Sequence, residues 1–236
     1  MYLKRLEIFT ALNNLPVKRF IKMDNTKSNL PGDWLQYGRI FTFIDFGNVN
    51  YWYERDERDG NGRELFKGEK LVIGIEQLAT YVKTFSVHSR FYFGLDPKQN
   101  KSIAIIAKAR KFFSKTVTKP IQKIKHYLSD GENVKVGWKR NSDARGQYIY
   151  LPKCNFDVEM CVDAIRLADN YDTFCLFSSD SDFASLADYL KRAKNKKVIL
   201  FSSGYVSYWL KDKVDLNING QAIKKQITFK KIKPRL

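Results

Sequence analysis

Residues 41–50 read Phe41-Thr42-Phe43-Ile44-Asp45-Phe46-Gly47-Asn48-Val49-Asn50, a mostly apolar run that stops at an aspartate. A second run stops in the same way and reads Phe174-Cys175-Leu176-Phe177-Ser178-Ser179-Asp180-Ser181-Asp182-Phe183. Short apolar runs of this kind are typical of buried strands in a parallel sheet, where ligands bind beyond the carboxyl ends. We therefore expect Asp45 and Asp180 to lie at the same edge of such a sheet.

Strands and helices are predicted to alternate along most of the chain. Alternation of this kind indicates an α/β fold with a parallel sheet that is covered by helices on both faces. Right-handed crossovers then place every strand-to-helix turn at one edge of the sheet. We expect strands at 39–45, 87–93, 134–138, 147–151, 174–178 and 197–201, and helices at 71–85, 97–115, 157–169 and after residue 182.

The composition favours one domain with appendages. The chain has 236 residues with 44% apolar content, and we divide it into an N-terminal extension (1–38), a domain (39–217) and a basic C-terminal tail (218–236), which we expect to be flexible from Lys224. No run of about 18 apolar residues occurs, and the first seven residues lack an uninterrupted apolar core, so we expect neither a transmembrane helix nor a secretion signal. Three cysteines without a Cys-x-x-Cys pair indicate reduced thiols. We therefore expect a cytoplasmic protein with no membrane partner.

The net charge of +17 is unevenly distributed. Residues 96–153 carry 14 Lys and Arg against 4 Asp and Glu, and residues 191–236 carry 13 against 2, so the rest is slightly negative. Basic segments that also contain aromatic residues favour nucleic acid as a partner, although lysine-rich faces that only aid solubility give the same composition. The residues that we expect to bind nucleic acid are Lys108, Arg110, Lys111, Lys115, Lys119 and Lys123.

A group of aspartates is predicted at the carboxyl edge of the sheet. Asp157 opens a predicted helix, and Asp45, Asp180 and Asp182 follow predicted strands. Several carboxylates at one edge repel one another unless a divalent cation lies between them. Three of the four also have an ordinary alternative role, because Asp45, Asp157 and Asp182 are all placed to cap a turn or a helix. Asp163 either holds a second ion or lies on a solvated acidic face.

Asp45 is followed in the chain by an asparagine and by three aromatic residues. Asn48 offers both a donor and an acceptor, which suits a phosphate oxygen or a neighbouring carboxylate. The aromatic set at residues 51–53 follows, and stacking on bases and packing in the core are equal alternatives for it.

Three blocks of the chain resemble the NYN family of PIN-like nucleases, in its LabA-like form. Residues 43–50 resemble the opening strand end of the family with its Asp-x-x-Asn pattern. Residues 153–165 (Lys-Cys-Asn-Phe-Asp-Val-Glu-Met-Cys-Val-Asp-Ala-Ile) resemble the central Asp-Val-x-x-x-x-Asp helix. Residues 177–183 resemble the Ser-Gly-Asp-Ser-Asp-Phe turn, with Ser179 where glycine is usual. The resemblance covers roughly residues 39–217.

The resemblance implies a Rossmann-like, PIN-type three-layer sandwich and a metal-dependent endoribonuclease. It implies that RNA is the substrate and that Mg²⁺ or Mn²⁺ is bound by Asp45, Asp157, Asp180 and Asp182, with Asp163 as an additional ligand. Asn48 would orient the substrate or a carboxylate. The chain carries every expected acid, and both a monomer and a homodimer are compatible with it.

Two alternatives to a nuclease remain open from the residues. The first is a non-catalytic RNA-binding or regulatory module that keeps the acidic edge for stability. The second is a haloacid-dehalogenase phosphatase, whose Asp-x-Asp-x-Thr motif is matched only in part because Ala184 stands in place of the threonine.

Overall fold

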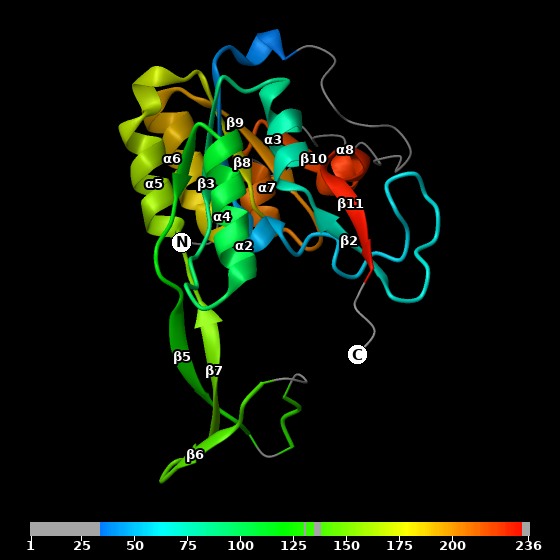
Figure 1. The fold of residues 1–236 in the computed structure, drawn as a ribbon. Helices are drawn as coiled ribbons and strands as arrows, with labels where there is room; N and C mark the ends of the chain where they lie inside the picture. Colours follow the sequence, from blue (N-terminus) through cyan, green and yellow to red (C-terminus); the bar gives the residue numbers. More distant parts are fainter. Residues whose placement is uncertain (1–33, 130, 135–137, 233–236) are drawn as a thin grey trace, which may run out of the picture.

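The computed structural model describes residues 34–129, 131–134 and 138–232. At its centre is a sheet of six strands in the order β10-β9-β8-β1-β3-β4, and every neighbouring pair is parallel (Figure 1). The carboxyl ends of all six strands therefore lie at one edge. The bounds are β1 Ile40–Asp45, β3 His88–Tyr92, β4 Lys115–Val117, β8 Thr173–Phe177, β9 Lys197–Ser202 and β10 Leu216–Asn219.

Helices cover both faces of this sheet, which confirms the expected α/β sandwich. One face is covered by α3 (Ile75–Lys83), α4 (Asn100–Phe112) and α8 (Lys224–Ile227). The other is covered by α5 (Asp157–Arg166), α6 (Ala184–Lys194) and α7 (Tyr208–Lys213). Short helical turns are α2 (Phe46–Val49) and the 3-10 helices η2 (Leu35–Tyr37), η3 (Ala168–Asn170), η4 (Ser181–Phe183) and η5 (Gly220–Ile223).

The two core layers follow from the alternation of side chains along each strand. In β1, Ile40 and Ile44 pack beneath α3, whereas Phe43 packs beneath α5 and α6. In β8, Phe177 joins the first layer and Phe174 joins the second. Both strands are buried on both faces, which explains why their sequences are almost continuously apolar.

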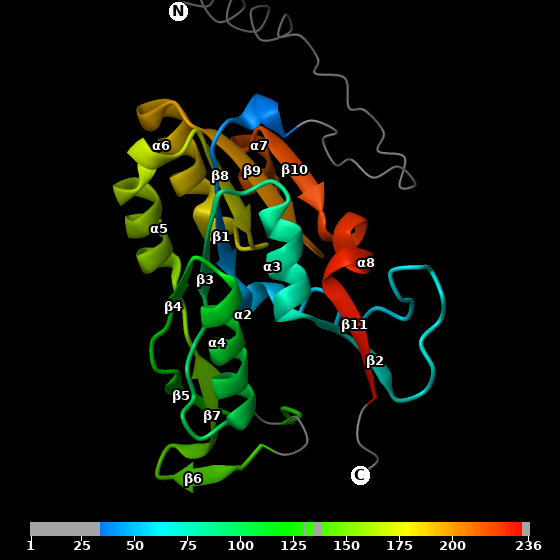
Figure 2. The same cartoon turned by 45° about the horizontal axis from the view of Figure 1, so that its top comes forward.

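A two-stranded antiparallel ribbon lies beside the α3 face (Figure 2). It pairs β2 (Glu69–Ile73) with β11 (Thr228–Ile232). The expected helix at 71–85 is therefore wrong at its start, since residues 71–73 form a strand and the helix begins at Ile75. The flexibility expected from Lys224 onward is also wrong for residues 224–232, which form α8 and β11 and contribute Ile227 to the core.

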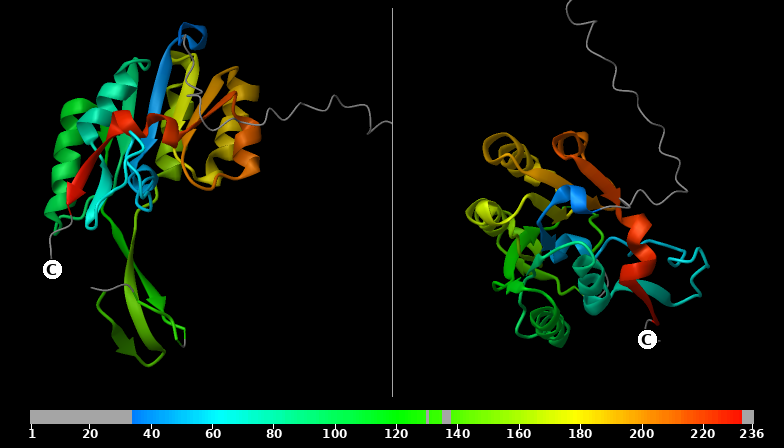
Figure 3. Two further views of the ribbon diagram at one scale, coloured as in Figure 1. Left: turned by 90° about the vertical axis from the view of Figure 1, so that its right-hand side faces the viewer. Right: turned by 90° about the horizontal axis from the view of Figure 1, so that it is seen from above.

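A second antiparallel sheet projects from the carboxyl edge of the domain (Figure 3). It consists of β5 (Gln122–Tyr127), β6 (Asn141–Asp143) and β7 (Gly146–Lys153), in the order β5-β7-β6. We call residues 122–153 the arm. The expected strand at 147–151 is part of β7, whereas the one at 134–138 falls mainly on residues 135–137, which lie outside the described residues. The central sheet instead ends with β4, whose first residue, Lys115, had been expected to end the preceding helix.

Within the described ranges, no helix has the length and apolar character needed to cross a bilayer.

Candidate metal centre and cleft

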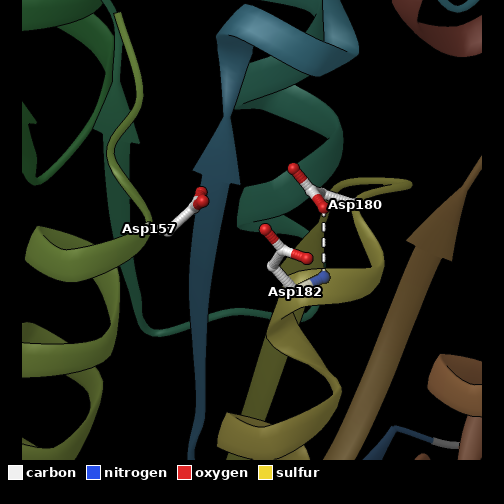
Figure 4. A group of neighbouring side chains, drawn as sticks. All are labelled: Asp157, Asp180 and Asp182. Atoms are coloured by element: carbon white, nitrogen blue, oxygen red, sulfur yellow. Dashed lines mark hydrogen bonds between the residues drawn. The ribbon is translucent and has the colours of Figure 1, made fainter.

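Three aspartates meet at the carboxyl edge of the central sheet. One carboxylate oxygen from each of Asp157, Asp180 and Asp182 lies within 4.8 Å of the others. Asp157 opens α5, whereas the other two belong to the turn that follows β8. Figure 4 shows the three side chains around the end of β1. Segments that are more than 20 residues apart in the chain thus contribute to one acidic group.

Local hydrogen bonds fix this geometry. The Asp180 carboxylate accepts a hydrogen bond of 3.0 Å from the Asp182 backbone N–H, so Asp180, and not Asp182, caps the turn (Figure 4). The side chain of Asn155 donates to Asp157 at 2.7 Å, and its oxygen accepts from the Asp157 backbone N–H at 2.7 Å. Asp157 therefore caps nothing, and its carboxylate is held beside the other two.

Asp45 lies next to this group at the end of β1. Its two oxygens accept hydrogen bonds from the backbone N–H of Asn48 at 3.3 Å and from the Ser178 hydroxyl at 3.1 Å. Burial raises the pKa of Asp45 to about 6, and the charges of Asp157 and Asp180 add to the increase. Burial, together with Asp180 and Asp182, also raises the pKa of Asp157. These carboxylates therefore lie where negative charge is unfavourable.

Within the described ranges, Lys and Arg side chains make no salt bridge with any of these four aspartates. Oxygens bound to one Mg²⁺ at about 2.1 Å in octahedral geometry lie roughly 2.9–4.2 Å apart, close to the spacing found here. Carboxylate oxygens are also the donors that Mg²⁺ and Mn²⁺ prefer. The residues therefore fit a divalent cation.

Asn48 joins the β1 turn to the β8 turn. Its side-chain oxygen accepts hydrogen bonds of 3.0 Å from the Trp52 indole N–H and of 3.0 Å from the Ser179 backbone N–H. Only oxygen can accept both bonds, so the orientation of the amide is fixed and its NH₂ group finds no acceptor among the described residues. Because Asn48 lines the cleft described next, this NH₂ group can donate to a ligand there.

The acidic group borders an open cleft with a volume of about 480 Å³. Its walls come from the end of β1, the end of β3, the start of α4, the root of the arm and the start of α5. Lys101 and Lys153 lie in the wall, as does Tyr51, whose ring is 61% exposed. Of the neighbouring aromatics, Tyr53 is buried in the core and Trp52 stacks on Phe177.

Asp163 is held apart from the acidic group. Its Oδ2 atom lies 2.5 Å from the Arg90 guanidinium and accepts from the Tyr92 hydroxyl at 2.9 Å, while its Oδ1 atom lies 2.8 Å from Arg166. Asp163 and Arg90 are both buried. The expectation that Asp163 binds metal is therefore corrected to a structural ion pair.

The six residues expected to bind nucleic acid are spread over α4, β4, β5 and the segment that joins β4 to β5. Lys108, Arg110 and Lys111 are exposed on α4, but Lys108 lies about 10 Å further along the helix than Lys101 at the cleft. Lys119 lies 2.6 Å from Glu159 and 4.9 Å from the centre of the Phe156 ring. Lys115 is exposed on β4 and Lys123 is exposed on the arm.

Four side chains at the site carry no strong sequence signal of their own. Ser178 was noticed only as a small hydroxyl, and Asn155 was not expected to contact Asp157. Lys101 and Lys153 were counted in the basic segment but were not assigned to the site. Asn155 lies two residues before a helix start, a spacing from which its bond to Asp157 could have been predicted.

A parallel α/β sandwich with aspartates grouped at its carboxyl edge defines the class of PIN-like proteins. The NYN domain model matches residues 39–218, so the chain belongs to the NYN domain family of PIN-like nucleases. The crystal structure of a protein of unknown function from Vibrio parahaemolyticus has a similar fold, with 22% identity and a TM-score of 0.52. This similarity covers 81% of the present chain and 96% of that one. No match was found among curated proteins.

Proposed function

We propose that the protein is a metal-dependent endoribonuclease that hydrolyses phosphodiester bonds in RNA with Mg²⁺ or Mn²⁺. The observation that carries this proposal is the group of Asp157, Asp180 and Asp182, whose oxygens lie within 4.8 Å of one another. Asp45 borders the same cleft with a pKa raised to about 6. A cation from outside the chain would relieve the repulsion among these carboxylates.

Each residue of the cleft has a role in this proposal. Asp157, Asp180 and Asp182 hold the cation. Asp45, at the end of β1, adds its negative charge to theirs. A divalent cation bound there neutralises charge on the scissile phosphate and lowers the pKa of the attacking water. The NH₂ group of Asn48 donates to a phosphate oxygen, while Lys101 and Lys153 attract the neighbouring phosphates.

RNA is proposed as the substrate because the chain carries a net charge of +17 and exposes an aromatic ring in the cleft. The affinity of lysine and arginine side chains for phosphates falls steeply as the salt concentration rises. Tyr51 offers a face on which an unpaired base can stack.

The test is incubation with labelled single-stranded RNA, with Mg²⁺ or Mn²⁺ and with EDTA. We expect shorter products only with the metal, and we expect Asp180→Asn to lower the rate by about 10³-fold, since a bound cation contributes several kcal/mol to catalysis. The matched control is Asp169→Asn, because Asp169 is an exposed aspartate outside the site.

A non-catalytic RNA-binding module makes the opposite prediction. It retains RNA on a gel without any metal-dependent shortening. Full cleavage by the Asp180→Asn protein in Mg²⁺ would refute the assignment of the metal centre, even if the wild-type protein is a nuclease.

A further inference from the structure

The arm begins and ends at the wall of the cleft. Pro152 and Lys153, at the end of β7, line the cleft, and α5 starts with Asp157 only four residues later. A Cβ atom at Gly94 would lie 2.7 Å from Ile121 and 2.8 Å from Cys154, so both roots of the arm pack directly on the end of β3. The eight residues of β7 then extend roughly 25 Å away from the domain (Figure 3).

The described part of the arm presents cations that its own acids do not neutralise. Its two described acids are already paired, Asp143 with Lys125 and Glu132 with His126. The remaining cations make no ion pair with any described residue, and they extend from the root to the tip: Lys123, Lys139, Arg140, Arg145 and Lys153.

One face of the arm combines two lysines, Lys123 and Lys125, with tyrosines. Because Lys123 pairs with Pro152 and Lys125 pairs with Tyr150 across β5 and β7, all four side chains share a face with Tyr148. Lys125 covers the Tyr148 ring at 3.8 Å, so that ring is occupied. Tyr150 is 46% exposed, and its ring lies one position from Pro152 on the face that leads into the cleft.

We propose that this face of the arm binds the segment of a single RNA strand that continues out of the cleft. Tyr150 stacks on one unpaired base, and Lys123, on the same face, contacts a phosphate beside it. The proposal rests on the proposed function, since it assumes that RNA occupies the cleft. A single strand is required because the bases of a duplex are stacked on each other and cannot stack on Tyr150.

The test is the binding of fluorescent oligouridylates to the full chain in EDTA, measured by anisotropy, with strands of about 16 and about 4 nucleotides. We expect Tyr150→Ala to bind the long strand about 5- to 100-fold more weakly and Tyr150→Phe to bind it like wild type. We expect Lys123→Ala to lower the slope of log affinity against log salt by about 1. The matched control is Gln147→Ala, on the opposite face of β7.

The short strand and an RNA duplex separate the arm from the cleft. We expect Tyr150→Ala to leave the affinity for both unchanged, because neither can place an unpaired base on the arm. An unchanged affinity for the long strand, or an equal loss for all three RNAs, would overturn the proposal. The proposal would also be overturned if Tyr150→Ala changed the molecular mass of the protein in sedimentation but did not change RNA binding. The face would then be an interface between copies of the chain.

The same RNA strands show whether the proposed role of the arm or the proposed nuclease activity is wrong. If the wild-type chain cleaves the long strand in Mg²⁺ but Tyr150→Ala binds it normally, only the role of the arm is wrong. If the wild-type chain cleaves neither strand but the Tyr150 effect is found in EDTA, only the nuclease is wrong. If the wild-type chain does not bind the long strand, both are wrong.

Discussion

Two aspartates of α5 lie in opposite environments. Asp163 is buried, and its carboxylate accepts hydrogen bonds from Arg90, Tyr92 and Arg166. Asp157 lies six residues earlier, and its neighbours are the amide of Asn155 and two further carboxylates. One aspartate thus has its compensating charge within the chain, whereas the other lies among like charges.

The difference separates an acid that stabilises the fold from one that is available to a ligand. A carboxylate that is already paired with a buried arginine has little to gain from a metal ion, because its charge is compensated. A group of unpaired carboxylates costs folding free energy until a cation arrives. Under the proposed function, the edge of the sheet gives up stability in exchange for binding a cation, and three measurements can break or sharpen this contrast.

The largest effect is expected from the same substitution at the two positions. Asp163→Asn leaves the buried Arg90 guanidinium without its counter-charge, and should lower the free energy of unfolding by about 3–5 kcal/mol. Asp157→Asn removes repulsion from Asp180 and Asp182, and should leave the stability in EDTA unchanged or slightly higher. Urea unfolding followed by circular dichroism measures both.

A large loss of stability at Asp163 without a loss at Asp157 is the essential result. Equal losses of stability would mean that Asp157 is as well compensated as Asp163, and the comparison would fail. Asp169→Asn is the control, because Asp169 is exposed and lies outside both groups. It should change the free energy of unfolding by no more than about 0.5 kcal/mol.

The contrast between the two aspartates also shows how far the sequence could predict the structure. The runs that end at Asp45 and Asp180 predicted two strands of one parallel sheet, because strands buried on both faces are almost entirely apolar. The start of α5 at Asp157 was equally clear. The partner of Asp163 was not predictable, because Arg90 lies 73 residues away on β3 and its inward direction depends on the register of the sheet.

The same limit explains the helix that was expected to start at residue 71. Leu71, Ile75, Leu78 and Val82 have helical spacing, but β2 pairs with β11, a strand more than 150 residues later. The local pattern contained no information about that partner. The arm was missed for a similar reason, since its strands pair with each other and leave the domain.

The second effect is the stabilisation of the folded chain by metal. A cation that binds the folded state alone at 100 times its dissociation constant adds about 2.7 kcal/mol, or roughly 5–10 °C in Tm for a domain of this size. Thermal unfolding with MgCl₂, at ionic strength matched with KCl, should show this shift in the wild-type protein. Asp182→Asn should lose most of it, whereas Asp163→Asn should keep the shift from its lower starting Tm. An equal loss in both variants would place Asp163 in the metal centre.

The smallest effect is the pH dependence that Asp45 causes in the metal-free protein. Burial raises the pKa of Asp45 from 3.8 to about 6, so the folded state binds its proton more tightly than the unfolded chain does. The stabilisation from this proton is complete below pH 3.8, and it is lost as the pH rises through 6.

Asp45→Asn isolates this contribution from the carboxylates that titrate in the opposite sense. In EDTA, the unfolding free energy of the wild type should fall relative to that of Asp45→Asn between about pH 4 and pH 6. Above that range, the difference should remain constant. Saturating Mg²⁺ should reduce that difference at neutral pH, because a cation beside Asp45 favours its charged form. A difference that is independent of pH in EDTA would mean that Asp45 ionises as easily as an exposed aspartate, and the edge of the sheet would then lack the unfavourable charge that distinguishes it from the Asp163 pair.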